Sequence, residues 1–528
     1  VLGMMGQLSS CDYLDIVPDE RAQESDTWKT EGAVRGYLYS CYGYLPANRT
    51  FGNSYWLAEE LTAVTKELFT TFKYGYYSPV SLGFTSNTWS TIWNGIHQCY
   101  MFQESLKQVS NEYVTDEMKK QYLAESNFLI AYYHFLSMRS YGPTMIIRSV
   151  IDLETPISGF PERSSIDEVV AFINEKLDEA MSEGGLPTTW SGKDYGRATR
   201  LAALALKSRV YLYAASPLYN GNTEMYADFR SPLDGRQLIA QEKSQAKWEI
   251  SATQTKYAID EVEKAKFHLY HDADAGEPSD AKPGLPNKAQ RRLRYTNIDN
   301  QTGNNPEIIW ADTRNDDYYG IQRRCPPRQT LGGKFAGISM TNCPTLQTIE
   351  AFYTKNGLPI NKDKTFDYDE RYEYISAPEN CDGNNYEDLV KYANFTPSSD
   401  KVMRLCTDRE PRFYAWTTYH NGYFEFGKYN NEEISADPAK RAIRIHLLRD
   451  DPHGRGNRTD QEYSISGFGN KKGVVPSAEW NVIEYPFPLF RLAELYLNYA
   501  EALVELDRLS EAKVYLDKVR ERAGIPSV

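Results

Sequence analysis

The segment from residue 486 to the end of the chain carries two neighbouring helical patterns, and this pairing restricts the fold more than any other feature. Apolar and aromatic residues recur at the spacing of one helix face, at Leu492, Leu495, Tyr496, Tyr499 and Leu503. After a short turn over residues 506–510, the pattern continues with Ala512, Leu516 and Val519. Small side chains at Ala500 and Ala512 let the two helices approach closely. Such a pair cannot bury its apolar faces alone, so it must pack on further helices.

The order of aromatic, small and apolar residues in this pair matches the tetratricopeptide pattern of about 34 residues. Helical spacing also predicts earlier helices over residues 28–45, 56–69, 89–106, 118–141, 165–183, 198–216 and 248–270. Gly142-Pro143 stops the long helix that begins at Met118, and Ser165 with Glu168 forms a capping-box signature. We therefore expect further helical pairs over residues 56–109, 118–182 and 198–270.

Residues 271–485 have a different character. Gly, Pro, Asn and Asp become frequent, and the candidate strands, 308–310 and 443–445, are short. Long polar loops are expected over 272–304, 361–400 and 427–480, and loops of this length are usually functional or poorly ordered. The prediction is a mainly α fold in one domain. We expect a helical scaffold over residues 11–270, completed by the last helical pair over 486–528. Between them lies a large irregular insertion, 271–485, that contains loops and short strands.

The N-terminal residues indicate a lipid anchor. Leu8-Ser9-Ser10-Cys11 follows a short apolar stretch and precedes an acidic segment. This pattern is typical of the end of a bacterial lipoprotein signal peptide, so residues 1–10 are assigned to the signal and Cys11 to lipidation by acyl chains such as palmitate. Buried acyl chains contribute about 0.8 kcal/mol per CH₂ and would hold the chain on a membrane surface. The alternative is a first strand with a structural cysteine, which Asp12 and Asp15 would interrupt.

Composition narrows the classes of partner. The net charge of −13 argues against nucleic acid, and no apolar run after residue 11 approaches the length of a membrane helix, about 20 residues. The 40 tyrosines suit half-wet recognition surfaces. The cysteines lack zinc-ribbon spacing. Cys41 and Cys99 fit a helical core, whereas Cys325, Cys343, Cys381 and Cys406 lie in loop-rich sequence and could form bridges in several pairings.

Catalytic motifs are sparse. The sequence has no His-Glu-x-x-His, Gly-x-Ser-x-Gly or Gly-x-x-x-x-Gly-Lys-[Ser/Thr] motif. His268 and His271 have a spacing that a metal could use, but two histidines at a helix end are more often solvated. Asp316-Asp317 could serve a two-carboxylate glycosidase mechanism, yet 72 acidic residues produce such neighbours by chance. We therefore predict no catalytic residue, no metal and no cofactor, and keep a helical-scaffold glycoside hydrolase as an alternative.

Two segments carry the residue types that recognise sugars, which need flat rings for C–H faces and planar polar groups for hydroxyls. The first is the loop over residues 72–79, with Tyr74, Tyr76 and Tyr77, although it could instead fold back over the helices. The second follows the strand at 308–310 and supplies Trp310, Asp312, Arg314, Asp316, Tyr318 and Tyr319. Arg323 lies just beyond and could meet a carboxylate.

Several segments together resemble the SusD/RagB family of surface nutrient-binding lipoproteins of Gram-negative bacteria. The segments are Ala124–Leu129 with Tyr141-Gly142-Pro143, Gly196-Arg197-Ala198-Thr199, Asn305-Pro306-Glu307-Ile308-Ile309, Asp408–Tyr414 and Arg491–Ala502. The resemblance implies a SusD-like α/α superhelix and ligand contacts from an N-terminal aromatic loop and from the region after the strand. It also implies a further helical stretch beyond Val528.

The predicted function follows from this resemblance. The chain is expected to sit on the outer membrane at the cell surface, bind oligosaccharides without transforming them, and deliver them to a SusC-like TonB-dependent transporter. An oligopeptide-binding component of the RagB kind is the alternative within the family. A passive tetratricopeptide adaptor is the alternative of another class, beside the hydrolase.

Overall fold

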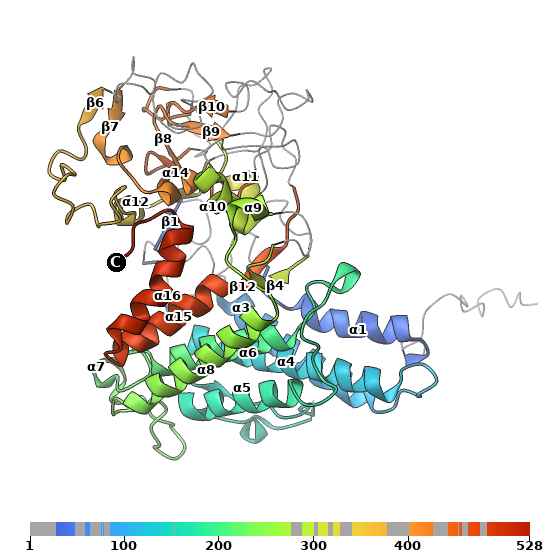
Figure 1. The fold of residues 1–528 in the computed structure, drawn as a ribbon. Coiled ribbons are helices and arrows are strands. Elements are labelled where there is room, and N and C mark those ends of the chain that lie inside the picture. The colour runs from blue at the N-terminus through green and yellow to red at the C-terminus, as the bar shows by residue number, and fades with distance from the viewer. Residues whose placement is uncertain are drawn as a thin grey trace, which may run out of the picture.

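A layer of long helices forms the base of the molecule, and an irregular cap with short strands lies above it (Figure 1). The computed structural model describes residues 28–47, 59–63, 75–76, 78, 85–152, 154–275, 288–299, 305–314, 320–327, 340–376, 401–425, 442–451, 453–456, 463–475 and 483–528. This arrangement confirms the predicted mainly helical scaffold with an irregular insertion.

The scaffold is built from helices that pack side by side. They are α1 (Glu31–Gly43), α3 (Thr85–Leu106), α4 (Asp116–Tyr141), α5 (Ile166–Ala180), α6 (Arg200–Ala215), α8 (Gln245–Lys264), α15 (Leu492–Glu505) and α16 (Leu509–Arg522). The predicted capping box is present, because Ser165 and Glu168 each bond the other's backbone at the start of α5. Thr115 caps α4, and Gly142 follows its last residue with a φ of +71°.

The last helical pair packs on α6 and α8, as its pattern requires. Ala500 and Ala512 are both buried where α15 and α16 meet. Asn498 on α15 donates to Ser208 Oγ on α6 at 3.1 Å, and Gln245 at the start of α8 donates to the carbonyl of Glu505 at 2.7 Å. Residues separated by more than 200 positions thus share one apolar core.

Short strands and short helices lie mainly in the cap and where it meets the scaffold, whereas the strand pair β2–β3 and helix α7 connect scaffold helices (Figure 1). The strands pair antiparallel as β1 (Leu61–Thr62) with β5 (Cys343–Pro344), β2 (Thr144–Met145) with β3 (Arg163–Ser164), β4 (Ile308–Asp312) with β12 (Phe487–Arg491), β6 (Tyr374–Ser376) with β7 (Lys401–Met403), β8 (Thr417–Tyr419) with β11 (Phe468–Asn470), and β9 (Tyr423–Glu425) with β10 (Ala442–Arg444). The short helices are α7 (Thr223–Tyr226), α9 (Asp272–Ala275), α10 (Lys288–Ile298), α11 (Ile321–Arg324), α12 (Leu346–Ala351) and α14 (Pro411–Trp416). The predicted strands at 308–310 and 443–445 correspond to β4 and β10.

Two sequence expectations are wrong. The described part of the expected helix 56–69 is a turn and strand β1, because its backbone pairs with β5 some 280 residues later. The expected polar loop 272–304 contains α10, which is almost wholly buried. Its charged sequence hides the helix because Arg294 lies inside and donates to the carbonyls of Ala415 and Val474 at 3.1–3.2 Å.

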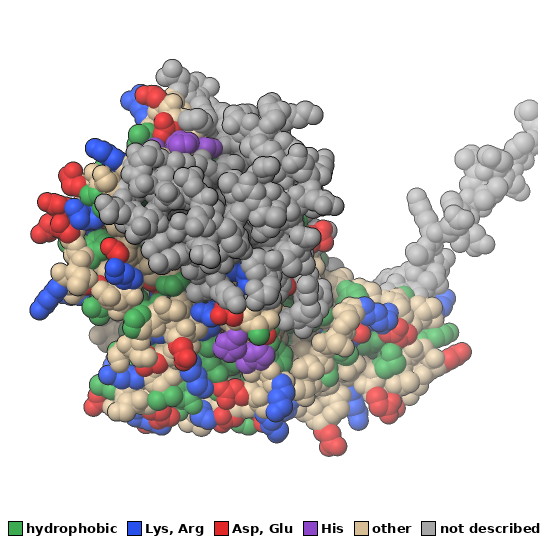
Figure 2. Space-filling view, turned by 45° about the horizontal axis from the view of Figure 1, so that its top comes forward, with side chains coloured by type: hydrophobic (Ala, Val, Ile, Leu, Met, Phe, Trp, Pro, Cys, Tyr) green, Lys and Arg blue, Asp and Glu red, His purple; other side chains and the backbone are tan. Residues whose placement is uncertain are grey.

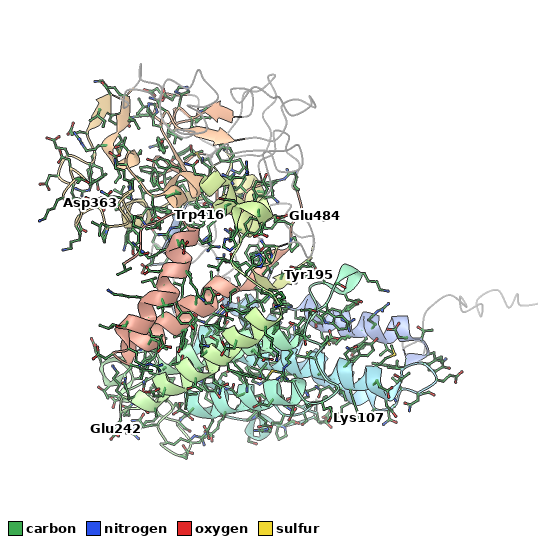
Figure 3. All side chains as sticks on the ribbon, in the orientation of Figure 1. Lys107, Tyr195, Glu242, Asp363, Trp416 and Glu484 are labelled. Atoms are coloured by element: carbon green, nitrogen blue, oxygen red, sulfur yellow. The ribbon has the colours of Figure 1, made fainter. Side chains whose placement is uncertain are left out.

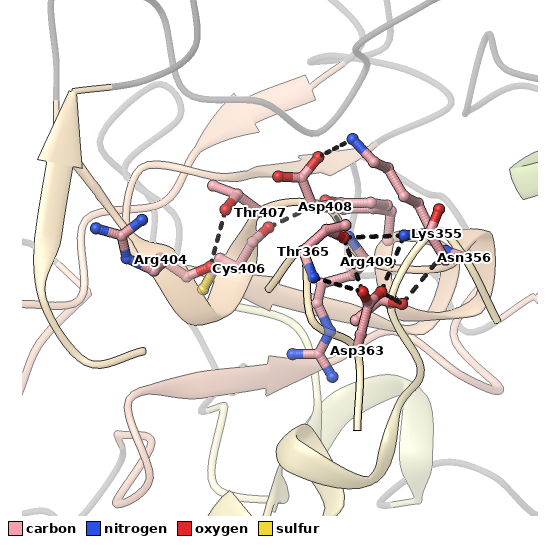
Figure 4. Close-up of polar contacts among 11 residues, drawn as sticks. Lys355, Asn356, Asp363, Thr365, Arg404, Cys406, Thr407, Asp408 and Arg409 are labelled. Atoms are coloured by element: carbon pink, nitrogen blue, oxygen red, sulfur yellow. Dashed lines mark hydrogen bonds and ion pairs between the residues drawn. The ribbon is translucent and has the colours of Figure 1, made fainter. Parts of the chain in front are cut away.

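A polar network holds residues 354–365 in the cap (Figure 4). The buried carboxylate of Asp363 accepts hydrogen bonds from Thr354 Oγ1 at 2.6 Å, from Asn356 Nδ2 at 2.9 Å, and from the backbone and side chain of Thr365. Burial alone would raise the pKa of Asp363, but these hydrogen bonds outweigh it and lower the pKa to about 2. The buried guanidinium of Arg409 likewise donates to backbone carbonyl groups.

Charges and thiols complete the description. Acidic and basic side chains intermingle over the scaffold on the face drawn in Figure 2. Cys41, Cys99, Cys325, Cys343 and Cys406 are buried free thiols, and Cys381 lies outside the described residues.

None of the helices in the described part of the chain combines the length and the apolar character needed to cross a bilayer.

Candidate functional site

The predicted N-terminal aromatic loop is represented by one described tyrosine. The side chain of Tyr76 is 71% exposed and could meet a ligand. Tyr74, Tyr77, Asp316, Tyr318, Tyr319 and the predicted lipidation site Cys11 lie outside the described residues.

Trp310 is enclosed, although the sequence predicts an exposed ring. Its ring centre lies 5.0 Å from that of Phe128 and 5.2 Å from that of Tyr132, and only 3% of the residue is exposed. Its Nε1 donates to the carbonyl of Gly196 at 2.8 Å. Strand β4 is buried between β12 and the helices. The faces of the Trp310 ring are therefore covered by neighbouring side chains, and the ring stabilises the scaffold core.

Asp312 and Arg314 pair with each other. The guanidinium donates to both carboxylate oxygens of Asp312, at 2.9 and 2.7 Å, and to the carbonyls of Leu45 and Pro46, at 2.8 and 3.0 Å. These carbonyls follow the C-terminus of α1, where backbone acceptors lack helical partners. Asp312 and Arg314 therefore attach β4 to α1, and a ligand would have to displace these bonds. Arg323 lies separately, in the last turn of α11.

A cavity of about 510 Å³ opens beside the predicted residues. We call it the aromatic pocket. Its walls come from the loop 188–199, from residues 265–267 after α8, and from residues 305–311 at β4. Tyr195 marks this position next to β4, below the cap, in Figure 3. The lining combines rings of Trp190, Tyr195 and Phe267 with hydroxyl groups of Thr188, Thr189 and Ser191.

A buried ion pair holds the aromatic pocket in place. Trp190 Nε1 donates to the carbonyl of Ala198 at 2.9 Å, and the guanidinium of Arg197 lies 4.2 Å from the centre of the Trp190 ring. Arg197 in turn donates to Glu125 on α4, whose carboxylate has no exposed surface, and to Asp194 at 2.8 Å. The Trp190 ring is thus oriented by the rigid interior of the scaffold before any ligand arrives.

Two cations are among the described residues that line the aromatic pocket, Lys266 and Arg197, and Arg197 is paired with Glu125 and Asp194. Burial raises the pKa of Glu125, which the hydrogen bonds from Arg197 and Tyr42 oppose. Burial, reinforced by the charge of Asp299, raises the pKa of Tyr195 to about 12, so its hydroxyl stays protonated at neutral pH. No Asp or Glu is among the described residues that line this pocket. Within the described part of the chain, no cluster of three or more His, Cys, Asp or Glu could hold a metal ion.

Sequence reasoning missed Trp190 and Tyr195. The usable signal was an aromatic pair in a loop with Gly192 and Gly196, between two clear helices, which is the same argument that singled out residues 72–79. The loop 188–199 was overlooked because it is short and adjoins a helix start.

Comparison with known proteins decides the family. The family model described as "SusD family" matches residues 306–528, and the model described as "Starch-binding associating with outer membrane" matches residues 12–212. The chain belongs to the SusD/RagB family. The aromatic pocket draws on both matched ranges, since the loop 188–199 lies in one and β4 in the other, while its residues 265–267 lie between them. No curated protein matches the chain.

Solved structures of SusD-like proteins have the same fold. The protein BT4246 is 28% identical, with a TM-score of 0.77 over 94% of this chain and 83% of that one. A SusD-like protein, BF3747, from Bacteroides fragilis NCTC 9343 is 21% identical, with a TM-score of 0.67 over 97% and 82%. A laminarin-binding SusD-like protein is 16% identical, with a TM-score of 0.52 over 94% and 85%.

Proposed function

We propose that this SusD-like chain is a cell-surface lipoprotein that binds oligosaccharides and delivers them to a SusC-like TonB-dependent transporter in the outer membrane. The observation that carries the proposal is the aromatic pocket in a chain of this family. The description of the N-terminal family model and the laminarin-binding neighbour support carbohydrate as the ligand class. The proposed role needs binding alone, without bond cleavage.

The aromatic pocket supplies the two kinds of contact that a neutral sugar needs. Because Arg197 lies over one face of Trp190, the other face of this ring and the ring of Tyr195 can cover C–H surfaces, while threonine and serine hydroxyls exchange hydrogen bonds with ligand hydroxyls. The predicted tyrosines at positions 74, 76, 77, 318 and 319 would extend this contact as further rings, and they stay predictions.

Calorimetric titration tests the ligand class. A panel of oligosaccharides, including laminarin and starch fragments, is titrated against the full chain beside a panel of oligopeptides. Trp190→Ala should lower the affinity for the sugar about thirty-fold, since removal of an anchoring ring costs about 2 kcal/mol of binding free energy. Trp28→Ala is the matched control, because Trp28 is also partly buried and packs on Tyr37 outside the pocket.

Other outcomes assign other roles. Peptide binding without sugar binding would establish the RagB-like alternative and overturn the sugar assignment. Release of reducing sugar would reveal a hydrolase. If Trp190→Ala and Tyr76→Ala both leave sugar affinity unchanged, the aromatic pocket is not the site and the aromatic loop contributes nothing.

Membrane attachment has its own test. Metabolic labelling with a palmitate analogue should mark the chain, and Cys11→Ser should abolish the label and release the protein from the outer membrane. Co-purification of a TonB-dependent transporter from detergent extracts tests the partner. An unlabelled, freely diffusing chain without such a companion contradicts the proposal.

A further inference from the structure

A second cavity, of about 260 Å³, lies where the cap meets the scaffold. It is lined from α4, α6, α10, the turn at 472–473 and β12, and it shares no lining residue with the aromatic pocket. We call it the basic cavity, because Arg139, Arg209, Lys472 and Arg491 line it without any acidic residue among the lining.

Two of the four cations already have partners. Arg209 donates to both carboxylate oxygens of Glu494, each at 2.6 Å, and Arg491 donates to Glu307 at 2.8 Å. The other two are different. The side chains of Arg139 and Lys472 make no hydrogen bond or ion pair with any described residue, and the Lys472 ammonium lies 4.6 Å from the ring centre of Trp416. Among the described residues, therefore, no carboxylate forms an ion pair with either of these two cations.

Two neutral donors in the same cavity are also unpaired. Asn297 is 8% exposed, and its buried Nδ2 has no hydrogen-bond partner. Tyr132 is 4% exposed, and its hydroxyl donates to no described residue. Burial raises the pKa of Tyr132, opposed by Arg209 and Arg139, so its hydroxyl stays protonated. An unsatisfied buried donor costs about 1–3 kcal/mol, which an acceptor in the cavity would recover.

We propose that the basic cavity binds the carboxylate of an acidic sugar residue. A carboxylate accepts hydrogen bonds and supplies the negative charge with which Arg139 and Lys472 can pair. Tyr485, Phe487 and Pro488 form an apolar side of the cavity that suits the C–H face of a sugar ring. The volume lies below the about 300–1,000 Å³ of sites for drug-sized ligands and fits one sugar residue. A peptide is disfavoured because its backbone N–H groups would face the hydrogen-bond donors that line the cavity.

The protonation state of the Lys472 side chain makes uronate binding depend on pH. Burial lowers the pKa of Lys472 to about 8, helped by the charges of Arg491, Arg412 and Arg522 and opposed by Glu60. A bound carboxylate favours the ammonium and raises this pKa. The affinity for a uronate should therefore decline as the pH rises above about 8, because the free protein then loses the charge that the ligand needs.

Calorimetry with matched sugars tests the proposal. The probes are trimers of D-galacturonic acid and of D-galactose, which differ only in the oxidation of C6. The acidic trimer should bind at least ten-fold more tightly, and Lys472→Gln or Arg139→Gln should each remove at least ten-fold of its affinity. Lys107→Gln is the matched control, because Lys107 is an exposed cation at the far end of the scaffold (Figure 3) and should leave binding unchanged.

Asn297→Asp provides a variant that keeps the fold and supplies the carboxylate internally. It should abolish binding of the acidic trimer and raise the melting temperature. The proposal is overturned if both trimers bind equally, if the two cation variants bind the acidic trimer as the wild type does, if sulfate competes as tightly as the uronate, or if a peptide carboxylate binds in its place. Trp190→Ala tests the aromatic pocket separately, so failure of one assignment leaves the other standing.

Discussion

His134 lies inside α4 with no exposed surface, and its protonation should control stability in acid. Its Nδ1 donates to the carbonyl of Ile130 at 2.8 Å, so its Nε2 is the acceptor for the backbone N–H of Ile147 at 3.3 Å. Protonation of Nε2 would break that second bond and place a charge beside the rings of Trp93 and Phe172. Burial, helped by the charges of Lys176 and Arg148, lowers the pKa of His134 to about 4.

The sign follows from linkage. The unfolded chain binds this proton with a pKa of about 6.5 and the folded chain with a pKa of about 4. The stability that neutral His134 contributes is therefore complete above pH 6.5 and is lost as the pH falls toward 4. Between pH 7.5 and 4.5 this group alone should remove about 2–3 kcal/mol from the free energy of unfolding.

Two variants isolate this contribution. His134→Gln keeps a donor and an acceptor, whereas His134→Phe keeps a ring, and neither titrates. Urea unfolding, followed by tryptophan fluorescence at pH 7.5 and 4.5, should show both variants losing about 2–3 kcal/mol less than the wild type across this interval. Their stabilities at pH 7.5 can differ without affecting this comparison. If both variants lose stability as steeply as the wild type, the reasoning about His134 is wrong.

Three further predictions test other contacts, the first with Glu104→Gln as its control. Glu307→Gln should lower the free energy of unfolding by about 3–5 kcal/mol because it leaves buried arginines without their carboxylate, whereas Glu104→Gln, in an exposed pair, should cost under about 1 kcal/mol. Gly196→Ala should cost about 1–3 kcal/mol by denaturation, since its φ is +100° and a Cβ would lie 2.8 Å from Thr313; an unchanged stability contradicts this. Arg314→Met should lower stability by about 1–3 kcal/mol in the same assay and leave sugar affinity unchanged; lost affinity at full stability would instead assign Arg314 to the ligand.

Local signals predicted much of the scaffold. The capping box at Ser165, the glycine after α4 and the small residues of the last pair each depend on neighbours within a turn or two, so the sequence contains them directly. The helix α10 was missed for the opposite reason. Arg294 is one of its most buried side chains, and carbonyl groups of Ala415 and Val474, distant in the sequence, accept its hydrogen bonds.

The candidate sites show the same division. Trp310 and Trp190 are both tryptophans in or beside a loop, and nothing local distinguishes them. Both line the aromatic pocket, but tertiary packing buries the first between α4 and β12, whereas it leaves the second half-buried and held in place through Arg197 and Glu125. The basic cavity collects its cations from α4, α6, β12 and a cap turn that lie far apart in the sequence.

The sequence by itself determined the helical pairs over 118–182, 198–270 and 486–528, their caps and the family, because periodicity and capping are properties of adjacent residues. Only the tertiary structure decided which rings are covered, which arginines have partners and which donors are left without an acceptor. Burial and pairing depend on the sum of contacts from distant segments, and no local pattern encodes that sum.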